Sequence, residues 1–399
     1  MTYLICPLAL CLLCRRSWHC RVPAVLSFLP LDTSMQLITS HAAVRRTFAI
    51  GALLSASISP VGAQTASGVT STIVVSDPRT APGTGYNNPA YYADRSVGSD
   101  YSGVVLLTFP VVNGTAACTG SYLGGGKILT AAHCVSNGST LTSSSFTARF
   151  YQSDVGWVDV MGTGYSVKSG YSNAVVNEND VAVLTLDTTA PSWARTYGLA
   201  SSSVLGLQET FAGYGRTGTG LTGATVDNNQ FNDNALLRRG LNTFETTCVG
   251  VANDAPLNCV HNTPSADFEG GVFLADFDGS GVSSQGTLCN TFGFCTAGYS
   301  QFAEVGIGPG DSGGASFLGD WTITGVASFA QVNSQDVGGF YGFADGFTCV
   351  AYVEGNDGCT SNYNFVESQL TTTTPEPGSL LLLASGFAGV LGIRRRRRR

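Results

Sequence analysis

The stretch of sequence that decides the fold is Gly308-Pro309-Gly310-Asp311-Ser312-Gly313-Gly314. Glycines on both sides of Ser312 permit a tight turn at positive φ and allow another backbone to approach closely. The backbone N–H groups of Gly310 and Ser312 can then converge on one carbonyl oxygen, which is the geometry of an oxyanion hole. Because glycine is abundant throughout the chain, with 50 residues, the prediction depends on the whole motif and not on its glycines.

A nucleophilic serine needs a base that accepts its proton. Outside the N-terminal leader the chain has two histidines, His133 and His261. His133 follows the strand-like residues 127–129 within Thr130-Ala131-Ala132-His133-Cys134, beside a cysteine that can hold it in place. His261, in Val260-His261-Asn262, has no such context and is predicted to be a loop residue. His133 is therefore the predicted base.

An acid must orient and support that base. Asp180 opens the apolar run Asp180-Val181-Ala182-Val183-Leu184-Thr185-Leu186, which predicts a buried strand. Burying a carboxylate at the start of such a strand costs free energy unless the carboxylate is paired, and His133 is the natural partner. The alternative is that Asp180 caps a turn after Asn179.

The rest of the chain has the composition of an all-β protein. Only 12% of its residues are charged and 10% are aromatic, and short apolar runs alternate with clusters of Gly, Ser, Thr and Asn. Between residues 64 and 374 there are 9 basic and 25 acidic residues, a balance of −16. A body this acidic is not expected to bind nucleic acid or anionic membranes, since both require a basic surface.

The motifs around His133, Asp180 and Ser312, in this chain order, resemble those of the trypsin/chymotrypsin family of serine peptidases. The resemblance covers roughly residues 96–370. It implies two packed six-stranded antiparallel β-barrels, with His133 and Asp180 in the first and Ser312 in the second. It also implies an endopeptidase that cleaves polypeptides through an acyl-enzyme without a cofactor. The rival interpretation is a non-catalytic surface or matrix protein that keeps the peptidase fold.

The same resemblance implies the substrate pocket. Counting back from Ser312 places its floor at Gly306, and its walls include Ser328, Phe329, Ala330 and Gly339. Because Gly306 offers no acid and Ala327, beside Ser328, offers no base, we expect uncharged side chains of small to medium size before the scissile bond. The chain departs from the family in that Ser312 lies 132 positions after Asp180 and in having no Ile-Val-Gly-Gly sequence.

Eight of the twelve cysteines lie outside the leader, an even number that is typical of disulfides in an exported protein. The resemblance implies that Cys118 pairs with Cys134. Proximity in sequence predicts three further pairs: Cys248–Cys259, Cys289–Cys295 and Cys349–Cys359. No Cys-x-x-Cys or Cys-x-x-His spacing occurs among the eight, which argues against a zinc site.

One segment resembles the first half of an EF-hand loop. It carries Asp276, Asp278 and Ser280 at positions 1, 3 and 5 and Gly281 at position 6, but Thr287 at position 12. A calcium site and a surface turn rich in Asp and Ser are the two interpretations of this segment.

The N-terminal part of the chain predicts export. Residues 35–63 contain Arg45 and Arg46, an apolar stretch and a small-x-small cleavage site ending at Ala63, which together form a signal peptide. The two arginines also resemble a twin-arginine signal, although any basic region would serve. Residues 1–34 are expected to be an upstream mis-start or a leader. Residues 64–95 are an extension or a propeptide, and in the second case Ser96 would become the mature N-terminus and its amine would pair with Asp311.

The C-terminal residues 371–399 combine Pro375-Glu376-Pro377, a short apolar run and six arginines. These three features resemble the PEP-CTERM sorting signal of Gram-negative bacteria, which an exosortase removes during transport. We expect signal peptidase and an exosortase-type enzyme as processing partners, a transient membrane tether through a transmembrane helix at residues 380–393, and a final location on the cell surface or in the medium. The alternative is a plain membrane anchor.

Overall fold

A computed structural model describes residues 73–75, 81, 83–174, 176–248, 270–277, 288–289, 293, 304–331 and 344–371, all within one compact unit, Ser59–Arg399. The predicted signal peptide and sorting signal lie outside these residues. The described part is almost entirely β structure, as the composition predicts. Its strands are β1 (Val74–Val75), β2 (Val104–Val111), β3 (Gly114–Gly124), β4 (Lys127–Thr130), β5 (Phe146–Gln152), β6 (Gly156–Val167), β7 (Ala182–Leu186), β8 (Gln208–Gly213), β9 (Thr217–Thr219), β10 (Gly223–Val226), β11 (Arg238–Thr243), β12 (Thr246–Thr247), β13 (Val272–Asp276), β14 (Val305–Gly306), β15 (Ala315–Phe317), β16 (Ile323–Gln331) and β17 (Ala344–Cys349). Its helices are the 3-10 turns η1 (Gly85–Asn87), η2 (Pro89–Tyr91) and η3 (Ala132–Cys134) and the α-helix α2 (Asp357–Thr371).

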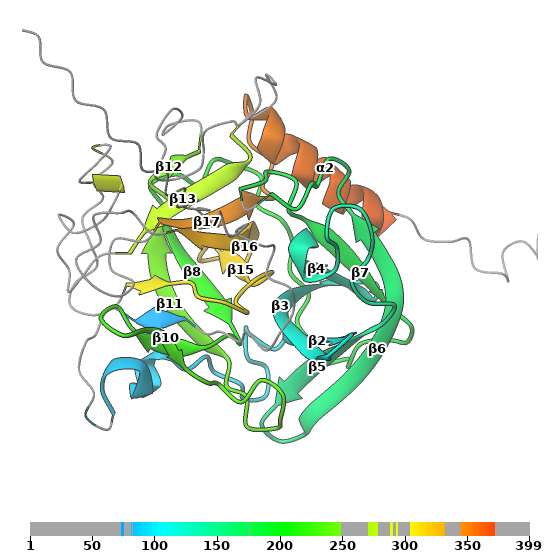
Figure 1. Cartoon of the computed structure of the whole chain (residues 1–399), viewed down its shortest axis with the longest axis vertical. Helices are drawn as coiled ribbons and strands as arrows, with labels where there is room; N and C mark the ends of the chain where they lie inside the picture. The colour runs from blue at the N-terminus through cyan, green and yellow to red at the C-terminus, as the bar shows by residue number, and fades with distance from the viewer. Residues whose placement is uncertain are drawn as a thin grey trace, which may run out of the picture. The chain divides into compact units, whose positions relative to one another are not determined.

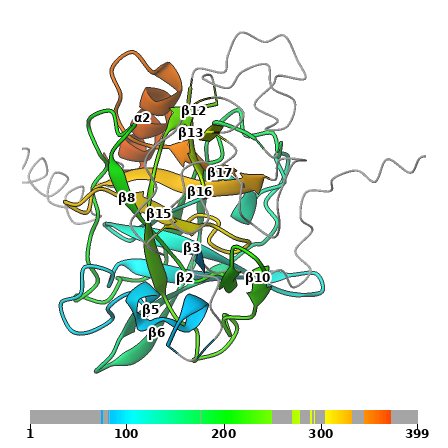
Figure 2. The ribbon, with the colours of Figure 1, turned by 90° about the vertical axis from the view of Figure 1, so that its left-hand side faces the viewer.

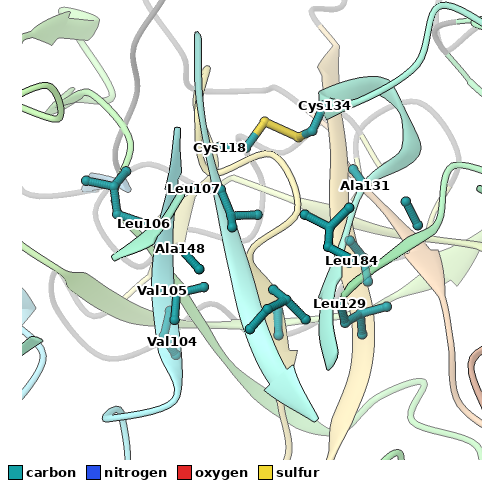
Figure 3. Close-up of a cluster of buried hydrophobic side chains, with 14 of the residues drawn as sticks. Val104, Val105, Leu106, Leu107, Cys118, Leu129, Ala131, Cys134, Ala148 and Leu184 are labelled. Atoms are coloured by element: carbon teal, nitrogen blue, oxygen red, sulfur yellow. A yellow bond between two sulfur atoms is a disulfide. The ribbon is translucent and has the colours of Figure 1, made fainter. Parts of the chain in front are cut away.

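The first six long strands close into a barrel in the order β2-β3-β4-β7-β6-β5 (Figure 1). Buried and half-buried residues alternate along its strands: in β5, Phe146, Ala148 and Phe150 are buried, and the residues between them are half-buried. The barrel closes where β2 pairs with β5, Leu107 opposite Ala148. Its interior is filled with Val, Leu and Ala side chains, several of which Figure 3 shows beside the Cys118–Cys134 disulfide. This barrel is the first of the two that the resemblance implied.

The second half of the domain is a seven-stranded sheet in the order β11-β8-β15-β16-β17-β13-β12, together with a four-stranded sheet β10-β9-β1-β14. Within the described residues the seven-stranded sheet curves as a half-barrel and is not closed. Four phenylalanines form its core, and Phe211 lies 4.4 Å from Phe347 and 5.6 Å from Phe244, between ring centroids. In both Figure 1 and Figure 2 this sheet lies next to the β2–β3 side of the barrel.

The segment before residue 96 is built into this second half. Val74 pairs with Gly306 of β14 on one side and with Gly218 of β9 on the other. Ile73, Val74 and Val75 are completely buried. From sequence alone, residues 64–95 are expected to be an extension or a propeptide, and no strand is predicted there.

The C-terminal helix α2 joins the two halves. Its Asn362 amide Nδ2 donates to the carbonyl oxygens of Glu178, before the barrel strand β7, and of Cys349, at the end of β17. A disulfide between Cys349 and Cys359 fixes the start of the helix to the same strand.

The expectation of a transmembrane helix is corrected. Among the residues that the structure describes, no helix is long and apolar enough to cross a bilayer. Residues 380–393, on which the expectation rested, lie outside the described ranges.

Candidate active site

His133 and Asp180 form a hydrogen-bonded pair at the end of the barrel that faces β16. The short turn η3 holds His133 directly after β4, and Asp180 lies directly before β7. Because β4 and β7 are paired, Thr130 opposite Ala182, the two residues are brought together. The Nδ1 atom of His133 lies 2.7 Å from Oδ2 of Asp180, and the backbone N–H of His133 donates to Oδ1 at 2.8 Å. The Asp180 carboxylate thus fixes both the ring and the backbone of the histidine.

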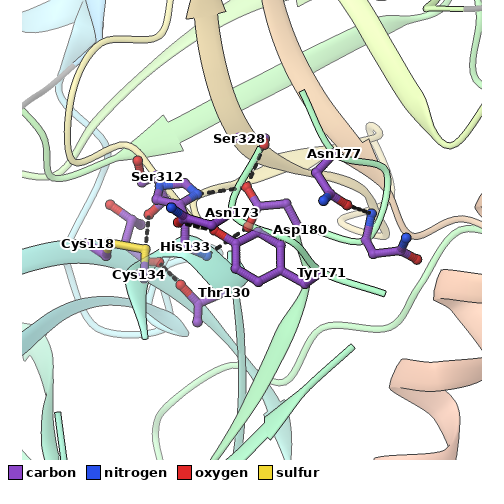
Figure 4. A network of polar contacts seen from close by, with 12 residues as sticks. Cys118, Thr130, His133, Cys134, Tyr171, Asn173, Asn177, Asp180, Ser312 and Ser328 are labelled. Atoms are coloured by element: carbon purple, nitrogen blue, oxygen red, sulfur yellow. Dashed lines mark hydrogen bonds and ion pairs between the residues drawn. A yellow bond between two sulfur atoms is a disulfide. The ribbon is translucent and has the colours of Figure 1, made fainter. Parts of the chain in front are cut away.

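Asp180 is the buried member of the pair, since 3% of it is exposed, whereas the His133 side chain is 30% exposed. A third donor reaches the carboxylate, because the hydroxyl of Ser328 in β16 donates to Oδ2 at 2.5 Å (Figure 4). We expected Ser328 to line the substrate pocket, but its hydroxyl is directed to Asp180. A buried carboxylate with three donors meets the condition under which such a group is stable.

The electrostatics of the pair favour a charged histidine. Burial opposes the charge on both groups, but their mutual attraction and hydrogen bonds outweigh it. The pKa of Asp180 is therefore lowered, also through the hydrogen bonds from Ser328 and from the His133 backbone, and the pKa of His133 is raised above 6.5. An imidazole whose protonated form is stabilised by a fixed carboxylate is suited to accept a proton in a reaction.

Ser312 lies next to the His133 ring, on the side away from Asp180, as Figure 4 shows. Its hydroxyl makes no hydrogen bond with another described residue, and catalytic hydrogen bonds of this kind often tighten only when substrate is bound. Two backbone N–H groups of the turn, those of Gly310 and Ser312, donate to no described acceptor, whereas Gly313 donates to Ala327 and Gly314 to Asp311. Gly310 adopts a φ of 93°, which a residue with a Cβ rarely does. Free donors at this turn are what an oxyanion hole requires.

Thr119 of β3 anchors the serine turn to the first barrel. Its N–H donates to the carbonyl of Ser312 at 2.8 Å, and its hydroxyl donates to the carbonyl of Gly310 at 2.9 Å. A Cβ on Gly313 would lie 2.0 Å from the Thr130 hydroxyl and 2.4 Å from the Thr119 carbonyl, so only glycine fits there. At the level of sequence we considered only the neighbouring Cys118, as a disulfide partner, and did not predict this role of Thr119.

Asp311, the residue before the serine, is 1% exposed. Its carboxylate accepts the N–H groups of Gly215 and Gly308, each at 3.2 Å. Burial raises the pKa of Asp311 to about 7, while these two hydrogen bonds and the charge of buried Arg238 oppose the rise. Gly213 allows this packing, since a Cβ there would lie 2.0 Å from Oδ1 of Asp311.

The remaining pocket residues lie on neighbouring segments. Gly306 ends β14, and Phe329 and Ala330 follow Ser328 in β16, all in the second half of the domain. Gly339 lies outside the described residues. The register of β16 and β17 also brings in a residue that the sequence analysis missed, Asp345, directly opposite Ala330. The sequence does contain a signal for Asp345, because it is an acid within the apolar run 342–348. An acid in an apolar run is also the pattern that identified Asp180.

Two disulfides are described in full. Cys118 bonds to Cys134 with a Cα–Cα distance of 6.3 Å, which ties β3 to the turn that carries His133, and Cys349 bonds to Cys359. Cys248 and Cys289 are also disulfide-bonded, and their predicted partners, Cys259 and Cys295, lie outside the described residues.

Two groups of residues bear on metal binding. Cys118, His133 and Cys134 lie close enough together to hold a metal, but both sulfur atoms are committed to a disulfide. Of the calcium candidates, Asp276 is buried in β13, where its carboxylate accepts the N–H of Cys289 at 3.3 Å. Asp278 and Ser280 lie outside the described residues.

Two family models match parts of the chain, and one solved structure is similar to it. The family model Trypsin matches residues 99–253, and the model of the PEP-CTERM protein-sorting motif matches residues 373–398. A solved structure described as "HL collagenase structure at 1.7A resolution" is similar, with a TM-score of 0.43 and 18% sequence identity over 70% of this chain and 97% of that chain. No curated protein matches the chain. Residues 99–253 thus match the Trypsin family model, and residues 373–398 match the model of the PEP-CTERM protein-sorting motif.

Proposed function

We propose that the protein is an exported serine endopeptidase that hydrolyses peptide bonds with His133, Asp180 and Ser312. The observation that carries the proposal is the arrangement of the three residues. A buried, triply hydrogen-bonded Asp180 holds Nδ1 of His133, and the ring lies between Asp180 and Ser312. An Asp–His pair of this kind activates one nucleophile, the residue beside the ring nitrogen that does not bind the aspartate.

The reaction follows from these positions. Ser312 Oγ attacks the scissile carbonyl while His133 Nε2 accepts its proton, and the N–H groups of Gly310 and Ser312 stabilise the oxyanion. His133 then gives the proton to the leaving amine, which leaves an acyl-enzyme on Ser312. Water, activated by the same histidine, hydrolyses the ester and restores the serine. Every proton in this scheme passes through His133, and the scheme needs no cofactor. The calcium site at Asp276, Asp278 and Ser280 stays a prediction.

Polypeptides in the medium or at the cell surface are the substrates that this proposal implies. The sorting motif supports export from a Gram-negative cell and removal of the C-terminal signal by an exosortase-type enzyme. The signal peptidase and the transient tether stay predictions. The expectation of an uncharged side chain before the scissile bond depended on the absence of an acid near Gly306, and Asp345 removes that reason.

The test is hydrolysis of an unfolded protein substrate by the secreted enzyme and by its Ser312→Ala variant. We expect the wild type to release peptides and the variant to lose about 10⁶-fold in kcat. A purified, folded wild type without activity on any unfolded protein would favour the rival, a non-catalytic surface protein that keeps the fold.

A further inference from the structure

A cavity of about 280 Å³ opens on the outer surface of the first barrel, and none of the triad residues lines it. Its floor is the outer face of β2, β3 and β5, which brings three threonines together. Thr108 lies opposite Thr147 in the β2–β5 pairing, and Thr115 comes from β3. The other wall is formed by residues 230–233, which lie between β10 and β11 in the chain.

Arg149 balances the charge of this cavity. Its Nε donates to Oδ1 of Asp159 at 2.9 Å, and its Nη2 donates to Oδ1 of Asp233 at 2.7 Å. The guanidinium group also lies 4.8 Å from the centre of the Trp157 ring, which holds it in place. An anionic ligand would meet two carboxylates, and a cationic ligand would meet the guanidinium group. The ligand that suits this arrangement is therefore neutral.

The cavity offers both donors and acceptors at close quarters. The three threonine hydroxyls and the Asn232 amide each donate and accept, and the two carboxylates accept. A ligand with several hydroxyl groups matches such a lining, because each hydroxyl can donate to one group and accept from another. The Phe231 ring, 45% exposed, stands beside these groups and offers an apolar face. A sugar ring has the same two characters, with hydroxyls around its edge and C–H groups on its face.

The wall that carries Phe231 is held in place before any ligand binds. On one side, the Gln230 Nε2 donates to the carbonyl of Tyr214 at 2.6 Å, and Gln230 is completely buried. On the other side, the Trp157 Nε1 donates to the carbonyl of Asp233 at 2.9 Å. Phe231 thus lies between two anchored positions, so little conformational entropy is lost when a ligand packs against its ring.

The floor does not suit an extended peptide. A peptide backbone binds a sheet by adding a strand to a free edge, but β2, β3 and β5 belong to a closed barrel in which each strand is paired on both sides. Side groups of the ligand must then supply the contacts. The volume fits one ring, since a cavity of about 150 Å³ already holds benzene, and the remainder accommodates hydroxyl groups.

We propose that this cavity is a second binding site of the protein and takes one ring of a neutral saccharide. The ring face packs on Phe231, and the hydroxyls bond to the threonines and to the carboxylates that Arg149 holds. The site is separate from the triad, and its existence does not depend on the peptidase reaction. A polysaccharide and a glycan carried by a protein substrate both present such a ring.

The test is calorimetric titration of the full secreted Ser312→Ala protein, which cannot digest itself. The probes are neutral hexasaccharides of glucose, galactose, mannose and N-acetylglucosamine, with hexagalacturonate as the anionic counterpart. We expect at least one neutral hexasaccharide to bind with a Kd of about 1 mM or below and hexagalacturonate to bind at least tenfold more weakly. Adding Phe231→Ala should raise the Kd at least tenfold. Leu221→Ala is the matched control, because Leu221 is also an exposed apolar side chain, outside the cavity, and its Kd should stay within twofold.

Two further measurements distinguish the sources of the saccharide. Retention of the protein on an immobilised polysaccharide of the sugar that binds, lost in Phe231→Ala, assigns the site to a polysaccharide. A KM of the active enzyme that is lower for an unfolded protein carrying that sugar than for its deglycosylated form, again only with Phe231, assigns it to a substrate glycan.

The proposal is overturned if none of the four neutral probes binds, if hexagalacturonate binds more tightly than they do, or if Phe231→Ala leaves the Kd unchanged. A KM that rises in Phe231→Ala for an unglycosylated protein would also overturn it, since the cavity would then serve the polypeptide. The titrations use a variant without the catalytic hydroxyl, so a failure of the peptidase function is seen separately and leaves their outcome unaffected.

Discussion

Three buried aspartates near Ser312 differ in what surrounds them, and the surroundings decide their roles. Asp180 receives three hydrogen bonds and faces a histidine, so its pKa is lowered. Asp311 receives two backbone N–H groups and has a pKa raised to about 7. Asp345 receives one and keeps an unpartnered oxygen, and its pKa is raised well above the usual range. The fewer hydrogen bonds each carboxyl group accepts, the more its pKa is raised by burial.

Replacement of Asp180 tests the first of these roles. The raised pKa of His133 predicts that kcat/KM falls as pH drops below an apparent pKa above 6.5, because the protonated ring cannot accept the serine proton. In Asp180→Asn the attraction that raises this pKa is gone, so the acid limb should move to lower pH. The maximal kcat should fall by roughly 10⁴-fold, the size that this exchange has in Ser-His-Asp triads. An acid limb that stays in place would contradict the role given to Asp180.

At the scale of elements, the strand β1 is a structural part of the second half of the domain. Burial of Ile73, Val74 and Val75 contributes roughly 1.5 to 3 kcal/mol for each side chain, and the sum is comparable to the whole stability of a typical domain. Arg238 adds a link, because its guanidinium donates to the Tyr86 carbonyl and lies 4.7 Å from the Tyr92 ring centre.

These contacts predict that residues 73–95 stay with the active enzyme. Asp311 already accepts two backbone N–H groups in the uncut chain, while the Ser96 N–H donates to Asp94 in an exposed turn. N-terminal sequencing of the fluorophosphonate-labelled protein should therefore find a start before Ile73. Labelled protein that starts at Ser96 would show instead that the segment is a propeptide. A variant that lacks residues 64–95 should fail to accumulate as folded protein.

The sequence predicted what depends on short motifs and missed what depends on register. The turn around Ser312 and the pairing of His133 with Asp180 follow from local patterns, and the barrel follows from the family resemblance that these motifs carry. Asp345 lies next to Gly306 only because β16 and β17 pair in one particular register, which no local pattern specifies. A strand of two residues such as β1 carries too little periodicity to be recognised before its neighbours are known.

For the whole molecule, buried acids set the dependence of stability on pH. Burial raises the pKa of Asp311 from 3.8 to about 7 and that of Glu209 from 4.5 to about 8. Between these values the folded state holds protons that the unfolded state has released, so the free energy of unfolding falls as pH rises. The raised pKa of His133 acts in the same direction above pH 6.5. Three pKa units on one group correspond to about 4 kcal/mol at most.

We therefore expect the Tm of the Ser312→Ala variant, which cannot digest itself, to decrease steadily from pH 5 to pH 8. Asp311→Asn in the same background should flatten the slope between pH 5 and pH 7. A Tm that rises over this range would contradict the burial of these groups as neutral acids.

The C-terminal motif makes a separate prediction for the exported protein. The mass of the protein in the medium should lack everything after about Pro377, since cleavage near Pro375-Glu376-Pro377 removes the apolar run together with the arginines. Replacement of these three residues by alanine should reduce release. Secreted protein that keeps its six arginines, or release unaffected by the replacement, would favour a plain anchor.

The central claim is that Ser312 is activated by His133 within an assembled triad. Its most direct test is labelling of the folded wild-type protein with a fluorophosphonate, followed by peptide mapping of the label, because unactivated serines do not react. Ser312→Ala and His133→Ala are the matched variants. We expect one label per molecule, on Ser312, and none on either variant. A folded wild type that stays unlabelled, or a label on a serine other than Ser312, would contradict it.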